Sequence, residues 1–295
     1  MTVRAVIFDW GGTLTPWHSI DPSELWQAVC ARHYPAAEVA AMAAAAWAAE
    51  VEFWRLAESS QRSSTLAGVF ARAGITASAA LLASYFDAWD PHTITDPDAA
   101  PLMRELRRRG IKVGVLSNTM WPRAWHEEVF RRDGVLHLID GSVYSSEIAW
   151  TKPHREAFGA AMAAIGVTDP GRCVFVGDRP YDDIHGAQAA GMRAVLIPNS
   201  DVPPFADAVP DAIVSSLAIH NIPTHDGRRQ ALDEAIRVLR PGARLAIADL
   251  WETNRHAAHL RDLGWHDVRR RNLGWRMWYG GPWFATRLVT ATKPG

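Results

Sequence analysis

The stretch "FDWGGTLTP", from Phe8 to Pro16, joins an apolar run to one aspartate and two glycines. The run Val6 to Phe8 predicts a buried β-strand, because it is continuous, apolar and bounded by turn residues. Asp9 then stands at the carboxyl end of that strand, which is where open α/β sheets bind their ligands. No second carboxylate follows before Pro16. The stretch therefore predicts a strand that carries a single functional carboxylate at its tip.

The same pattern, a short apolar run with a polar tip, recurs along the chain. It is found in "IKVGVLSNT" (111–119), "RCVFVGD" (172–178) and "RAVLIPN" (193–199). Helix-like stretches separate these runs, which is typical of a mostly parallel sheet covered by helices. Asp9, Ser117 with Asn118, and Asp178 each follow one of the runs. We predict an α/β fold with a Rossmann-like, mostly parallel sheet and these side chains at one edge.

A long alanine-rich, helix-like stretch, residues 17–91, follows the first strand. Asp21, Pro22 and Glu24 have the spacing of a helix start with a capping box. The tryptophans of this stretch either pack inside a helical unit or line a substrate pocket; they are Trp26, Trp47, Trp54 and Trp89. We predict a helical cap over 17–91, inserted into a core made of 1–16 and 92–212.

The tail begins after a segment rich in proline near residues 203–210. A strand is expected over 212–217, and a helix over 228–239, where apolar residues share one face. "RLAIADL" (244–250) then predicts a strand, "RHAAHLRDLG" (255–264) a helix, and the tryptophan-rich end a pair of strands. The tail is thus expected to be a half-domain of alternating elements.

Composition narrows the classes of partner. The formal net charge of −1 gives no electrostatic reason to expect nucleic acid or a membrane surface as a partner. Cys30 and Cys173 have no metal-type spacing and suit a reducing compartment. No signal peptide and no membrane-spanning apolar run is recognisable. We expect a cytoplasmic protein without nucleic-acid or membrane partners.

Four segments occur in a characteristic order: Asp9 in "FDWGGTLT", Ser117 in "LSNT", Lys152 in "TKP", and Asp178 in "GDRPYDDIHGA". Together they resemble the haloacid dehalogenase superfamily of phosphohydrolases over about residues 1–217. The resemblance implies that Asp9 attacks phosphorus and forms an aspartyl phosphate, and that Ser117 and Lys152 complete the catalytic set. It also implies that Ser117, Asn118 and Lys152 bind the substrate, a small phosphorylated metabolite.

The resemblance further implies a magnesium ion. Its ligands would be Asp9, the backbone carbonyl of Gly11, Asp178 and Asp183. Asp183 matches the family position five residues after the first aspartate, and Asp182 is a weaker candidate. Carboxylate oxygens are the hard ligands that Mg²⁺ prefers, and the ion would offset the repulsion between an attacking carboxylate and a phosphate.

Gly11 departs from the family pattern, because most phosphatases of the superfamily have a second aspartate there that serves as general acid and base. Such a group contributes about 10² to 10⁴ in rate. The phosphonate-cleaving branch also lacks it but needs a cap lysine, and no lysine precedes Lys112. Metal-independent dehalogenases have Tyr there and lack the acidic set. Three possibilities remain: an acidic leaving group, a substitute base such as His18, or phosphate binding without turnover.

The tail from Asp211 onward resembles the C-terminal half of class I S-adenosylmethionine-dependent methyltransferases. That family binds its cofactor through an earlier glycine-rich turn, and "FDWGGTL" does not have the GxGxG spacing. Residues 213–295 are therefore predicted to be a partial methyltransferase-like region, in which His220 and Asn221 are not assigned a catalytic role. Trp275, Trp278 and Trp283 either belong to the core of this region or, if exposed, indicate a homodimer face. We predict a magnesium-dependent phosphohydrolase that turns over slowly because Gly11 replaces the acid and base. A phosphate-binding pseudoenzyme or interaction protein is the alternative, and methyl transfer ranks third.

Overall fold

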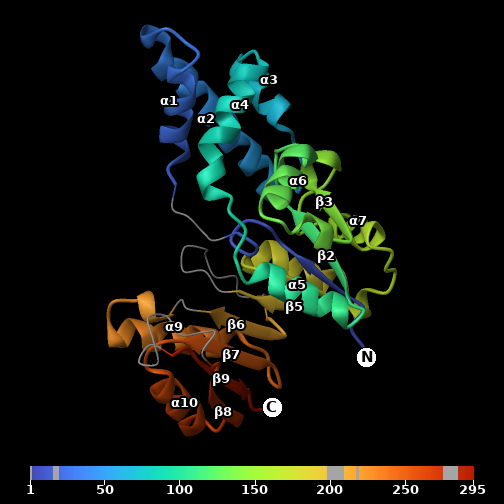
Figure 1. Cartoon of the computed structure of the whole chain (residues 1–295), viewed down its shortest axis with the longest axis vertical. Coiled ribbons are helices and arrows are strands. Elements are labelled where there is room, and N and C mark those ends of the chain that lie inside the picture. Colours follow the sequence, from blue (N-terminus) through green and yellow to red (C-terminus); the bar gives the residue numbers. More distant parts are fainter. Residues whose placement is uncertain (1, 16–19, 198–208, 217–218, 275–284) are drawn as a thin grey trace. The chain divides into compact units, whose positions relative to one another are not determined.

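The structure, a computed structural model, describes residues 2–15, 20–197, 209–216, 219–274 and 285–295 (Figure 1). Its strands form one nine-stranded sheet in the order β3-β2-β1-β4-β5-β6-β7-β9-β8. The strands are β1 (Ala5–Phe8), β2 (Lys112–Ser117), β3 (Gly141–Tyr144), β4 (Cys173–Gly177), β5 (Arg193–Leu196), β6 (Ala212–Ser216), β7 (Arg244–Asp249), β8 (His266–Asn272) and β9 (Arg287–Thr292). The predicted α/β fold class is confirmed.

The chain divides into two compact units. One consists of Met1–Val174 with Ala189–Met192, and the other of Phe175–Gln188 with Arg193–Gly295. In the first unit, β2 pairs in parallel with β1 and with β3. All four residues of β1 are buried, as expected for a central parallel strand. The helices α5 (Ala99–Arg108), α6 (Arg123–Arg132) and α7 (Arg155–Ala164) complete this part of the fold.

The insertion after β1 is helical, as predicted. Its helices are α1 (Pro22–Ala31), α2 (Ala36–Ser60), α3 (Leu66–Ala73) and α4 (Ala79–Trp89). The Asp21 side chain caps α1 by accepting a hydrogen bond from the Ser23 amide at 2.8 Å. Trp26 is buried and donates to Glu50 at 2.7 Å, whereas Trp54 is 37% exposed. Burial raises the pKa of Glu50. Trp26 therefore belongs to the interior of the helical unit.

The tail continues the sheet with strands of both directions. β6 pairs in parallel with β5 and with β7, and β9 runs antiparallel to both β7 and β8. The helix expected from residue 228 begins earlier, as α9 (His225–Val238), because the Thr224 side chain caps it by accepting from the Gly227 amide. α10 (Thr253–Asp262) likewise begins two residues before the expected 255.

Two groups of predicted residues lie outside the part of the chain that the structure describes. They are His18 and the tryptophans Trp275, Trp278 and Trp283. Among the described residues, no helix combines the length and apolar character needed to span a membrane.

Candidate metal and phosphate site

A buried ion pair joins the end of β1 to the loop before α7. Asp9 is 5% exposed and Lys152 is 2% exposed. The Lys152 Nζ donates to Asp9 Oδ1 at 2.6 Å, although 143 positions separate the two residues. A buried charge pair of this kind is costly to break, because removal of one partner leaves the other charge uncompensated. The fold therefore holds a cation directly against the carboxylate that the sequence singles out.

Asn118 fixes the backbone that carries Lys152. Its Nδ2 donates to the Lys152 carbonyl at 3.0 Å, and its Oδ1 accepts from the Lys152 amide at 2.7 Å. The two bonds tie the loop after β2 to the Lys152 loop. Asn118 was expected to bind substrate, and the structure places its carboxamide on the backbone of Lys152.

The loop after β2 is held by further hydrogen bonds. Ser117, the last residue of β2, is 2% exposed. The Thr119 amide donates to Ser145 Oγ at 2.8 Å, and Ser145 Oγ donates to the Thr119 carbonyl at 2.9 Å. Thr119 Oγ1 accepts from the Trp121 amide at 3.0 Å and lies 3.1 Å from His126 Nε2. This network holds the backbone that presents Ser117.

His126 is the buried aromatic member of that network. Its ring stacks on Tyr144 with centroids 4.4 Å apart and meets the Trp10 ring edge-on at 4.5 Å. Burial, with a smaller contribution from the charge of Arg123, lowers the pKa of His126 to about 3. The imidazole is therefore neutral at pH 7. Its place on α6 gave no signal in the sequence, because an isolated histidine on a charged helix does not show what packs against it.

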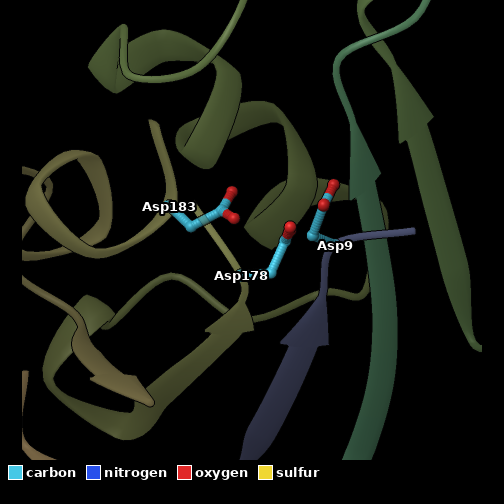
Figure 2. A group of neighbouring side chains, drawn as sticks. All are labelled: Asp9, Asp178 and Asp183. Carbon is cyan, nitrogen blue, oxygen red and sulfur yellow. The ribbon is translucent and has the colours of Figure 1, made fainter. Parts of the chain in front are cut away.

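Three aspartates converge at the strand ends (Figure 2). Asp9 follows β1, Asp178 follows β4, and Asp183 lies in the π-helical turn Pro180–His185. All three are buried, and one carboxylate oxygen from each lies within 4.8 Å of the others. Figure 2 shows the three carboxylates turned toward a common space. The structure thus brings together the three carboxylates predicted as metal ligands.

Gly177 makes room for Asp183. A Cβ at position 177 would lie 2.3 Å from Asp183 Oδ2, so any other residue there would displace this carboxylate. The same Oδ2 accepts from the Arg179 amide at 2.9 Å. The glycine before Asp178 and the tight turn after it therefore both allow Asp183 to lie close to the end of β4.

The donor set suits a hard divalent cation. Three carboxyl groups lie together, and the Lys152 amine contacts Asp9. Carboxylate oxygens at this spacing are ligands for Mg²⁺ rather than for a soft metal. Asp9, Asp178 and Asp183 can hold such an ion. Gly11, whose carbonyl was expected to contribute, forms an isolated bridge with Thr15 on the loop after β1.

The comparisons with known proteins agree with this geometry. Haloacid dehalogenase-like hydrolases match residues 3–191, and the methyltransferase domain family matches residues 184–247. Glyceraldehyde 3-phosphate phosphatase of Methanopyrus kandleri is 34% identical over 119 residues, which are 40% of this chain and 50% of that protein. The chain thus spans about half the length of this relative.

Two further matches cover the tail and the fold. An O-methyltransferase of Aspergillus nomiae is 48% identical over 62 residues, which are 21% of this chain and 26% of that protein. The solved structure of a phosphatase from Thermococcus onnurineus aligns with a TM-score of 0.52 at 20% identity and covers 72% of this chain and 93% of that one. At this identity the structural match shows the fold alone. On the family match over residues 3–191, the chain belongs to the haloacid dehalogenase-like hydrolases.

Proposed function

We propose that the chain is a magnesium-dependent phosphohydrolase that acts on a small phosphorylated metabolite. One observation carries the proposal: the Asp9 carboxylate lies within 4.8 Å of the Asp178 and Asp183 oxygens and 2.6 Å from the Lys152 amine. Asp9 attacks phosphorus, and the bond between phosphorus and the leaving oxygen breaks. The phosphatase name of the Methanopyrus kandleri relative supports the same substrate class.

In this proposal the remaining site residues divide the work. Lys152 neutralises charge on Asp9 and on the phosphoryl oxygens, and Ser117 donates a hydrogen bond to a phosphoryl oxygen. Asn118 takes part in binding by holding the Lys152 backbone in place. A bound Mg²⁺ on Asp9, Asp178, Asp183 and the Gly11 carbonyl would supply the positive charge that lets an anionic nucleophile approach a phosphate.

We further propose a division of labour along the chain. Residues 1–16 with 92–212 form the catalytic core, and 17–91 form a cap that selects the substrate. Residues 213–295 form the partial methyltransferase-like region. The family match to this region begins at residue 184, inside the hydrolase match, so the earlier half of a methyltransferase domain has no counterpart outside the hydrolase part. This favours phosphate chemistry over methyl transfer.

The experiment is a phosphate-release assay on the full chain. p-Nitrophenyl phosphate and a panel of small phosphometabolites are supplied with Mg²⁺, and the assay is repeated with a chelator. We expect release that the chelator stops. Asp233→Asn is a matched control, because Asp233 is an exposed aspartate in the tail. If folded protein released no phosphate from any member of the panel with Mg²⁺ present, the proposal would be wrong.

A further inference from the structure

Gly11 occupies a position that has room for a side chain. A Cβ built on it meets no atom within 4 Å. Its backbone does not lie in the left-handed region, in contrast to the neighbouring Gly12, whose φ is 79°. Neither a clash nor backbone strain therefore explains the glycine. The described residues therefore leave room for a side chain at position 11, beside the end of β1.

Residues 10–15, the described part of the loop after Asp9, supply no substitute acid or base. Residues 10–15, "WGGTLT", include no group that titrates near neutral pH. The Trp10 ring packs against Trp121 and His126, and the Thr15 hydroxyl donates to the Trp10 carbonyl. His126, which meets that ring edge-on, stays neutral and has its Nε2 against Thr119. The described part of this loop thus presents a nucleophile and no proton carrier.

The lack of a proton carrier in residues 10–15 affects the two halves of the proposed reaction differently. In the first half, an Asp9 oxygen bonds to phosphorus, and the leaving oxygen departs with the electron pair of the broken bond. An alkoxide needs a proton at that moment. A carboxylate does not, because carboxylic acids have a pKa near 4. A donor with a carboxylate leaving group therefore phosphorylates Asp9 without help from position 11.

In the second half, the oxygen of a water molecule bonds to phosphorus, and the Asp9 oxygen leaves as a carboxylate. The attacking water must lose a proton, whichever donor was used. Residues 10–15 offer no general base for this proton, and a step without one forfeits about 10² to 10⁴ in rate. We propose, on the basis of the function proposed above, that the chain takes its phosphoryl group from acyl phosphates and accumulates the Asp9 aspartyl phosphate, because hydrolysis is its slow step.

The test follows acetyl phosphate, with Mg²⁺ and the full chain, by rapid quench. We expect a burst of acetate approaching one per chain, followed by slow release, and a mass increase of one phosphoryl group in the quenched protein. Asp9→Asn should show neither. A phosphorylated alcohol such as phosphoserine should react far more slowly than acetyl phosphate.

Gly11→Asp and Gly11→Asn form a matched pair of similar size that differ in the ability to carry a proton. Gly11→Asp should remove the burst and raise steady-state turnover about 100-fold or more, and Gly11→Asn should keep the burst.

Linear acetate release by wild type from the first turnover, without a mass increase, would overturn this inference and leave the proposed hydrolase intact. Equal rates on acetyl phosphate and phosphoserine would also overturn it. Wild type that neither gains mass nor releases product from any donor would instead contradict the proposed function. The wild-type burst decides the matter even if the variants fail to fold.

Discussion

Two sets of buried carboxylates at the ends of parallel strands are stabilised in different ways. Asp249, the last residue of β7, is fully buried, and it accepts hydrogen bonds from His220 Nδ1 at 2.7 Å, the His220 amide at 3.1 Å and the Leu250 amide at 2.7 Å. Asp9, Asp178 and Asp183 instead lie with their oxygens within 4.8 Å of one another. Asp249 is thus surrounded by donors from its own part of the chain. Asp9 accepts from Lys152 Nζ at 2.6 Å and Asp183 from the Arg179 amide at 2.9 Å, but these two carboxylates also lie beside each other and beside Asp178.

Glu252, three residues after Asp249, is likewise paired with side chains of its own part of the chain. Glu252 accepts from Arg228 at 3.0 and 3.1 Å and from Arg255 at 3.2 Å, and it pairs with His225 at 3.0 Å. Arg228, by its hydrogen bonds, is the main cause that lowers the pKa of Glu252 to about 2. A carboxylate matched in this way holds structure together. The two regions therefore differ in arrangement: Glu252 is paired with cationic side chains, whereas three carboxylates lie together around Asp9.

The largest expected effect is the loss of the nucleophile. Asp9→Asn should reduce phosphate release to below about a thousandth of wild type, because a neutral amide cannot form the aspartyl phosphate. Asp249→Asn is the counterpart in the tail and should leave release per folded chain unchanged. Steady-state assays of both variants measure this, and equal losses in the two would erase the distinction between the regions.

Metal removal is expected to have the next largest effect. Mg²⁺ at 100 times its dissociation constant should stabilise the folded chain by about 2.7 kcal/mol, since the ion binds the folded state. Asp178→Asn should lose this gain. Thermal unfolding with and without a chelator tests this, and a full Mg²⁺ shift in Asp178→Asn would contradict the site.

Asp249→Asn should lower the free energy of unfolding by about 1 to 3 kcal/mol, because the charge-assisted bonds to His220 become neutral or are lost. Urea unfolding at pH 7 measures the change. Asp233→Asn again provides a control, since this aspartate pairs with His259 at the surface and exposed pairs contribute little. A change in Asp249→Asn as small as in the control would remove the structural role from Asp249.

The smallest effect concerns the neutral histidine of the first unit. The pKa of His126 is about 3 in the folded chain and near 6.5 unfolded, so below pH 6.5 the unfolded state binds more protons. Stability should therefore fall as the pH drops, by about 1.3 kcal/mol between pH 7 and pH 5.5. His126→Phe keeps a ring on Tyr144 and removes this dependence. Urea unfolding of both proteins at pH 7 and 5.5 gives the difference, and identical pH slopes would exclude the assignment.

The sequence predicted the carboxylate cluster because its signals are local. An aspartate directly after a predicted strand lies at the carboxyl end of that strand, and parallel strands bring such ends to one edge of the sheet. Asp9 and Asp178 could be predicted in this way, and the spacing of the family motif predicted Asp183. The helical insertion and the cap of α1 by Asp21 followed from composition and capping chemistry in the same manner.

What the sequence did not predict depends on partners far along the chain. Asn118 binds the backbone of Lys152, 34 positions away, and backbone partners leave no trace in residue type. His126 and Asp249 are buried by residues from other elements, which periodicity within one helix or strand does not reveal. The early start of α9 was different. Thr224 is an ordinary capping residue and could have been recognised as the N-cap. The helix start was predicted near residue 228 instead, because the apolar face begins later than the N-cap.

β6 pairs with both β5 and β7, so the tail covers the edge of β5. In a chain shortened after Leu196, β5 would present a row of unpaired amides and carbonyls to solvent, and such open borders recruit other strands into aggregates. β6 and the strands beyond it occupy that border. The methyltransferase-domain match over residues 184–247 includes β6, so part of the matched segment covers an edge of β5 that would otherwise be open.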